Sequence, residues 1–127
     1  MATQESLTCI TLEAGADLSS DQYKMVTLSA GKAVLCSAAT DVPVGVLQNK
    51  PASGQAATVC ISGASKVLAG GTIASGDLVG TDASGTADKK IAGTDTTEYV
   101  VGRALTGGAS GEIVTALINT EAPHRAS

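Results

Sequence analysis

The sequence has 127 residues and a net charge of −4, from 8 basic and 12 acidic side chains. Aromatic residues make up only 2% of the chain and no basic stripe is present, which excludes the usual surfaces for nucleic acids. No apolar run reaches the roughly 18 residues of a membrane-spanning helix, and residues 1–6 lack the features of a signal peptide, so we expect synthesis in a cytoplasm and no membrane partner.

The chain consists of short apolar segments rich in Val and Thr, separated by clusters of Gly, Ser, Asp and Asn. This pattern is typical of β-strands joined by turns. A short helix over Glu13–Ser20 is the only helical segment that we considered, and Gly15 weakens it. The pattern predicts ten strands, at Leu7–Leu12, Tyr23–Leu28, Ala33–Ser37, Val44–Gln48, Ala57–Ser62, Ser65–Leu68, Asp77–Thr81, Thr86–Lys89, Val100–Leu105 and Ile113–Ile118.

The predicted fold is a single all-β domain over residues 1–127, with the compact form of a β-sandwich or barrel. Its parts are an N-terminal arm (1–6), a β core (7–118) and a C-terminal tail (119–127). The two end segments are either frayed termini or arms that order on a neighbouring subunit. The core must be built from 21 Ala, 11 Val, 10 Leu and 6 Ile, without Phe or Trp, so we expect assembly to add to its stability.

The sequence also contains a weak internal repeat with an offset of 57 residues. Seven of the eighteen positions in 44–61 are identical to those in 101–118, including a Val-Gly pair and an Ala-Ser-Gly turn. An earlier match, of 30–33 with 84–87, requires a shift of register. The alternative is chance similarity in a chain rich in Gly, Ala and Ser. The repeat predicts two similar β units in which Val44–Gln48 and Val100–Leu105 are equivalent strands and Gly54 and Gly111 equivalent turns.

The three cysteines, Cys9, Cys36 and Cys60, have neither a C-x-x-C spacing nor a nearby histidine. A zinc site or a nucleophilic cysteine would need such partners, and the one histidine of the chain is His124 in the tail. We therefore expect all three to be unpaired and buried as small hydrophobic side chains.

The other candidate motifs for chemistry are incomplete. Residues 71–76 have the G-x-x-x-x-G spacing of a phosphate loop, but Asp77 stands where such a loop needs lysine. Asp82 with Asp88, and Asp95 with Glu98, are carboxylate pairs in polar segments, where such residues usually form turns. A Ser-His-Asp arrangement would have to use the terminal His124. We expect no catalytic, cofactor-binding or metal-binding residues and no cofactor, so the protein is predicted not to be an enzyme.

The segment Val42–Gly63 resembles the middle of the small capsid decoration, or cement, proteins of tailed bacteriophages. The resemblance continues through Val67–Val79, the Asp82–Gly85 turn, Tyr99–Leu105 and Gly111–Leu117, and so covers about residues 20–118. It implies a compact β fold, homotrimers on the outer capsid surface, the major capsid protein as partner, and no catalytic residues.

The sequence therefore predicts a structural virion protein that binds the outside of a phage capsid and stabilises it by bridging capsid subunits. Its acidic charge agrees with an outer surface, because a protein that faces packaged DNA should be basic. Two alternatives remain: another phage structural part, such as a tail-tube or head–tail joining protein, and a β module that binds carbohydrate or a cell surface.

Overall fold

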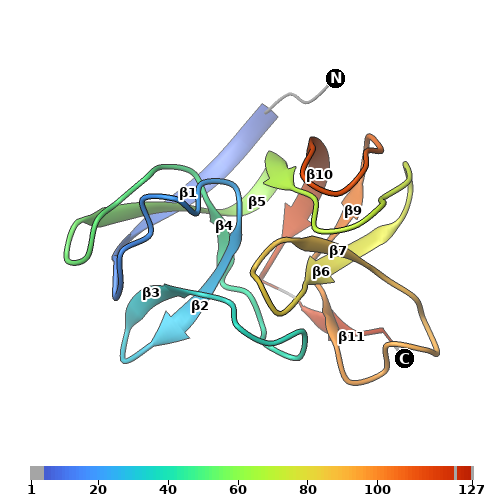
Figure 1. The fold of residues 1–127 in the computed structure, drawn as a ribbon, viewed down its shortest axis with the longest axis horizontal. Coiled ribbons are helices and arrows are strands. Elements are labelled where there is room, and N and C mark those ends of the chain that lie inside the picture. Colours follow the sequence, from blue (N-terminus) through green and yellow to red (C-terminus); the bar gives the residue numbers. More distant parts are fainter. Residues whose placement is uncertain (1–4, 122, 127) are drawn as a thin grey trace.

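The computed structural model describes residues 5–121 and 123–126, and within this part of the chain the regular structure is all β, as predicted. Nine of the eleven strands form one main sheet, and the other two form a small second sheet (Figure 1). The strands are β1 (Glu5–Glu13), β2 (Met25–Ser29), β3 (Lys32–Leu35), β4 (Gly45–Leu47), β5 (Ala56–Leu68), β6 (Leu78–Thr81), β7 (Ala87–Lys90), β8 (Tyr99–Val100), β9 (Gly102–Ala104), β10 (Ile113–Asn119) and β11 (His124–Arg125).

The main sheet is antiparallel and has the strand order β3-β2-β4-β5-β10-β9-β6-β7, with β1 paired to β5. Its two halves repeat one topology. In the first, a β2–β3 hairpin is followed by β4, which pairs with β2 and with β5. In the second, a β6–β7 hairpin is followed by β9, which pairs with β6 and with β10. The predicted pair of β units is therefore present.

The residue registers of the two units also agree. Val46 lies opposite Cys60 between β4 and β5, and Arg103 lies opposite Leu117 between β9 and β10, each 57 residues later. The turns are equivalent too, because Gly54 and Gly111 have positive φ angles of 83° and 87°. The repeat is thus a structural one, and the predicted equivalence of the two Val-Gly strands is confirmed.

Strand β5 belongs to both units. Its first half pairs with β1 and β4, and its second half pairs with β10 along Ser62–Leu68 (Figure 1). The second half of β5 therefore pairs with the last strand of the second unit, β10, as β1 pairs with the last strand of the first unit, β5. Each unit curls toward closure through one parallel bridge, Ala14 to Ala33 in the first unit and Ala69 to Ala87 in the second.

Two groups of buried aliphatic side chains fill the units. The smaller group fills the first unit and includes Leu18, Val26 and Leu47. The larger group fills the second unit and also takes in side chains from the first. The side chains that the first unit contributes to this larger group are Met25, Cys36, Val46 and Cys60. The two units consequently share one continuous packed region, with no large aromatic side chain in it.

The helix considered over Glu13–Ser20 is wrong. Strand β1 runs to Glu13, and the next two residues are bonded to the sheet: the Ala14 amide donates to the Gln55 carbonyl and the Gly15 amide to the Ala33 carbonyl, both at 2.8 Å. A helix would also pair the Leu18 amide with the Ala14 carbonyl, but the Leu18 amide donates to the Pro51 carbonyl and the Ala14 carbonyl accepts from the Gly54 amide, both at 2.9 Å. Leu18 then turns inward and is buried, which anchors the connection to β2.

Three further boundaries differ from the predicted ones. The predicted strands at Ala57–Ser62 and Ser65–Leu68 are one strand, β5, because Gly63 continues the ladder at a φ of 115°. The strand predicted at Val100–Leu105 is divided into β8 and β9. The C-terminal segment contains β11, whose His124 and Arg125 pair with β8. Of the predicted N-terminal arm, residues 1–4 lie outside the described residues.

Candidate interaction surface

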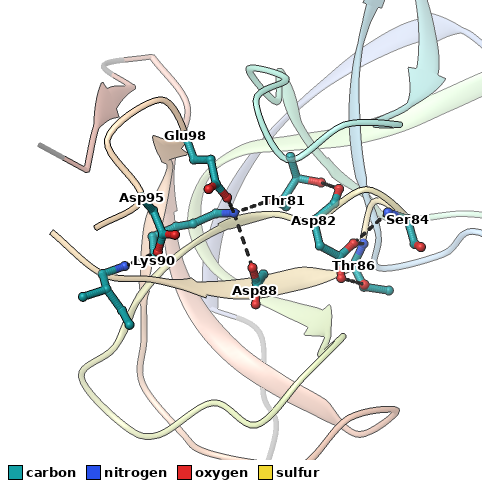
Figure 2. Close-up of polar contacts among 9 residues, drawn as sticks. Thr81, Asp82, Ser84, Thr86, Asp88, Lys90, Asp95 and Glu98 are labelled. Carbon is teal, nitrogen blue, oxygen red and sulfur yellow. Dashed lines mark hydrogen bonds and ion pairs between the residues drawn. The ribbon is translucent and has the colours of Figure 1, made fainter. Parts of the chain in front are cut away.

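The polar residues around the β6–β7 hairpin are engaged in holding the backbone (Figure 2). One carboxylate oxygen of Asp82 accepts from the amides of Ser84 and Thr86, at 2.8 and 3.1 Å, and its other oxygen accepts from the Thr86 hydroxyl. Asp95 accepts from the amide of Ile91 at 2.7 Å in the same way. The prediction that these two aspartates form turns is confirmed.

The other two candidate carboxylates, Asp88 and Glu98, bind a buried cation. The Lys90 ammonium is fully buried and lies 2.5 Å from Glu98 Oε1 and 3.4 Å from Asp88 Oδ2. It also donates to the Thr81 carbonyl at 2.7 Å. Figure 2 shows that this lysine ties the segment after β7 back onto the hairpin. The carboxylates are thus committed to a structural ion pair and are not arranged as an acid–base pair.

The cysteines occupy two kinds of environment. Cys36 and Cys60 are buried as predicted, whereas Cys9 is exposed on β1, so its predicted burial is wrong. Cys9 lies opposite Cys60, next to a register shift in the β1–β5 ladder. Burial raises the pKa of the Cys36 thiol to about 12, and burial also raises the pKa of Cys60. Both inner thiols are therefore poor nucleophiles at neutral pH.

The remaining candidate motifs lie apart from one another. His124 is exposed on β11, and residues 71–76 form a turn in which the Gly76 amide donates to the Ala104 carbonyl at 2.7 Å. Over the described ranges, no three His, Cys, Asp or Glu side chains are grouped as a metal site. Nor does the described part of the chain contain a helix long and apolar enough to span a membrane.

The outer face of the second unit carries exposed apolar side chains. Leu78 on β6 lies opposite Arg103 on β9, which in turn lies opposite Leu117 on β10. Leu117 is 52% exposed, and Leu105, just after β9, is 46% exposed. We call these four residues, the half-buried Leu78 and the exposed Arg103, Leu105 and Leu117, the exposed row.

A shallow apolar pocket of about 240 Å³ lies along this row, between it and the C-terminal segment. Val101 and Gly102 contribute to its floor, and His124 of β11 forms part of its wall. Large aliphatic side chains that surround a hollow on a protein of this size mark an interaction surface. This surface was not predicted from the sequence. The repeat could have indicated it, because residues of the exposed row occupy positions equivalent to Met25, Val46 and Cys60, which are buried in the first unit.

Comparison with known proteins identifies the fold. The chain matches no known family model, and no curated protein sequence is significantly similar to it. Its structure is similar to the crystal structure of the N base of the head fiber gp8.5 of bacteriophage phi29, with a TM-score of 0.65 and 22% sequence identity. The match covers 91% of this chain and 96% of that chain. The two proteins therefore share one fold over nearly their whole lengths.

Proposed function

We propose that this protein is a structural component of a bacteriophage head that binds the outer surface of the capsid. The observation that carries the proposal is the similarity of nearly the whole fold to the base of a phage head fiber. The resemblance of residues 20–118 to capsid decoration proteins supports the same location. The net charge of −4 agrees with an outer surface, where no contact with packaged DNA is made.

We further propose that the protein acts as a homotrimer that bridges neighbouring subunits of the major capsid protein. A closed cyclic trimer matches the three-fold and quasi-three-fold axes of an icosahedral shell. Such a trimer contacts several subunits at once, so individually weak contacts combine into tight attachment. With only two tyrosines and no Phe or Trp, the chain lacks the aromatic anchors of a single strong contact, which favours this multivalent attachment.

The test is to mix the purified protein with heads that lack it and to separate bound from free protein by sedimentation. We expect saturable binding and, in negative-stain images, regularly spaced protrusions on the heads. Rings or tubes without binding to heads would instead identify a tail component and would contradict the proposal. Binding to neither heads nor tails, with retention on host cells or glycans, would favour a surface-binding module.

The bridging role has a separate test. Decorated and bare heads are heated, and the temperature at which each releases DNA is recorded. We expect decorated heads to release DNA at a higher temperature, because each bound trimer must detach before neighbouring subunits separate. Release at one common temperature would leave the attachment in place but would remove the stabilising role.

A further inference from the structure

The first unit shows what covers the face that the second unit leaves open. Residues 25, 46 and 60 of the first unit, which correspond to Leu78, Arg103 and Leu117 of the exposed row, are fully buried against the second unit. The contrast at one position is large, since Cys60 is 0% exposed and Leu117 is 52% exposed. This fold therefore packs its outer face against another unit of the same fold within the chain.

The contacts of that internal interface involve the second half of β5. The side-chain amide of Gln48 donates to the Ser65 hydroxyl at 3.0 Å, and the backbone amide of Leu68 donates to the Tyr23 carbonyl at 2.9 Å. The Lys66 ammonium lies over the Tyr23 ring, 5.9 Å from its centre. Residues 65, 66 and 68 of β5 are thus the surface that receives the outer face of the first unit.

Strand β1 presents the corresponding surface at the other end of the molecule. The register of β1 on β5 matches that of β5 on β10, because Leu12 lies opposite Ala57 as Val67 lies opposite Val114. Residues 10, 11 and 13 of β1 therefore correspond to residues 65, 66 and 68 of β5. We call Ile10, Thr11 and Glu13 the β1 surface.

The β1 surface is open to solvent. Thr11 and Glu13 are exposed and line a shallow hollow next to the Gly54 turn, whereas Ile10 is half-buried and packs in part against the core of the first unit. The main-chain edge of β1 that faces away from β5 is a typical site for adding a further element. The chain thus carries, at its two ends, an uncovered outer face and an uncovered surface of the kind that receives such a face.

The residues of the exposed row and of the β1 surface that correspond to the internal contact residues are chemically complementary to one another. The hydrogen-bonded pair of Gln48 and Ser65 corresponds to Leu105 and Ile10, so two polar side chains that meet inside the chain are matched by two apolar ones. Exposed charges of opposite sign, Arg103 and Glu13, lie on the two surfaces, and Glu13 also forms an exposed ion pair with Lys32 at 3.1 Å. The part of the outer face around Lys90 is covered by the segment after β7, whose Glu98 binds the Lys90 ammonium. The uncovered part of the face is therefore the exposed row.

We propose that the exposed row binds the β1 surface of a second copy of this chain. The contact joins two different patches, so a pair of copies keeps one free row and one free β1 surface in total, and the closed ring of three copies in the proposed function would leave neither patch free. This interface supplies the self-association in the proposed function and in that respect rests on it. It is nevertheless a property of the isolated protein and requires no capsid.

The first test is the state of association of the purified full chain by sedimentation equilibrium. Leu117→Glu places a charge in the row, and Thr11→Arg places a bulky charge on the β1 surface; both positions are exposed, so each variant should fold. We expect each change to raise the apparent Kd of self-association by at least about 30-fold, as loss of a central contact does. Val42→Glu, at an exposed position outside both surfaces, is the matched control and should associate like the unchanged protein.

Mixing the two blocked variants gives the sharpest result. Leu117→Glu retains a working β1 surface and Thr11→Arg retains a working row, so an equimolar mixture should form dimers and nothing larger. Continued self-association of either variant alone would overturn the inference, because an interface between identical patches leaves one of the two variants able to associate. A mixture that stays monomeric would overturn it as well. Leu105→Glu provides a second block of the row.

Binding to bare heads, measured in parallel, separates this inference from the proposed function. A protein that forms the row-dependent oligomer but does not bind heads would contradict the capsid role and leave the interface standing. A protein that binds heads but remains monomeric in solution at every concentration would leave the capsid role standing and refute the interface.

Discussion

Gly45 and Gly102 occupy the same position in the two units, and each lies against a carbonyl oxygen of the next strand, that of Cys60 and that of Leu117 respectively. A Cβ atom at either glycine would overlap that oxygen, so any side chain there must push two strands apart. This close approach explains why both units have a glycine at this position.

Substitution of either glycine should therefore destabilise the protein. We expect Gly45→Ala and Gly102→Ala each to lower the free energy of unfolding by about 1–3 kcal/mol, as overpacking of a tight interior does. Urea denaturation followed by circular dichroism measures the change. Gly71→Ala is the control, because the nearest atom to its Cβ would be 3.9 Å away, and it should be nearly neutral. An equal loss for all three would show that the close approach is not the cause, because the lower backbone entropy of an unfolded alanine variant acts in the stabilising direction.

The buried ion pair of Lys90 should contribute strongly to the cohesion of the second unit. Lys90→Met keeps much of the side-chain volume but leaves Glu98 and the Thr81 carbonyl without their donor, so we expect a loss of about 3 kcal/mol in unfolding free energy. Glu98→Gln keeps a hydrogen-bond acceptor for Lys90 and should cost less. Thermal unfolding of both variants shows which of them loses more stability. A larger loss for Glu98→Gln than for Lys90→Met would contradict the prediction that Lys90 is the main stabilising group of this ion pair.

Thiol labelling should distinguish the three cysteines. Cys9 is exposed, whereas Cys36 and Cys60 are buried and have raised pKa values. A thiol reagent at pH 8 without reductant should modify one cysteine per native chain rapidly, and all three after denaturation. Cys9→Ser is the control and should remove the rapid phase. Recovery of only one thiol from the denatured chain would instead reveal a disulfide.

Alkaline pH should lower the stability through the buried thiols. Because folding raises the pKa of Cys36 to about 12, the unfolded chain loses this proton first as the pH rises above about 9. The contribution is present below that pH and is lost progressively up to the folded pKa, by at most about 1.4 kcal/mol per pH unit for each thiol. The unfolding free energy of Cys36→Ala should fall less steeply between pH 9 and 11, and parallel slopes would exclude the thiol as the cause.

Much of the fold could be predicted from the sequence, because strand periodicity and turn residues are local signals. The β2–β3 and β6–β7 hairpins, with Gly31 and Gly85 at positive φ, follow directly from Ala-Gly and Ser-Gly turns. The helix over 13–20 failed for a non-local reason, since the Ala14 carbonyl and the Leu18 amide, which a helix would pair, bond to residues far along the chain. Propensity within a window cannot register such partners.

The interaction surface could not be predicted for a related reason. Leu117 and Ile118 are both apolar and adjacent on β10, yet only Leu117 is exposed, and the equivalent of Leu117 in the first unit, Cys60, is buried. Exposure at this position depends on whether another unit lies against it. That depends on the order of the units and not on the residue itself. The exposed Cys9 was missed because strand-like neighbours do not reveal that β1 lies at the edge of the sheet.

The two units differ in how their last strands end. In the first unit, the last strand passes Ser62 and continues to Leu68, and so becomes the opening strand of the next unit. In the second unit, β10 stops at Asn119, which lies opposite Ser62 in the ladder. The architecture is therefore open to modular growth: a designer who lengthens β10 by six residues and appends another hairpin and strand pair would obtain a three-unit chain, in which the added module takes over the face that is now free.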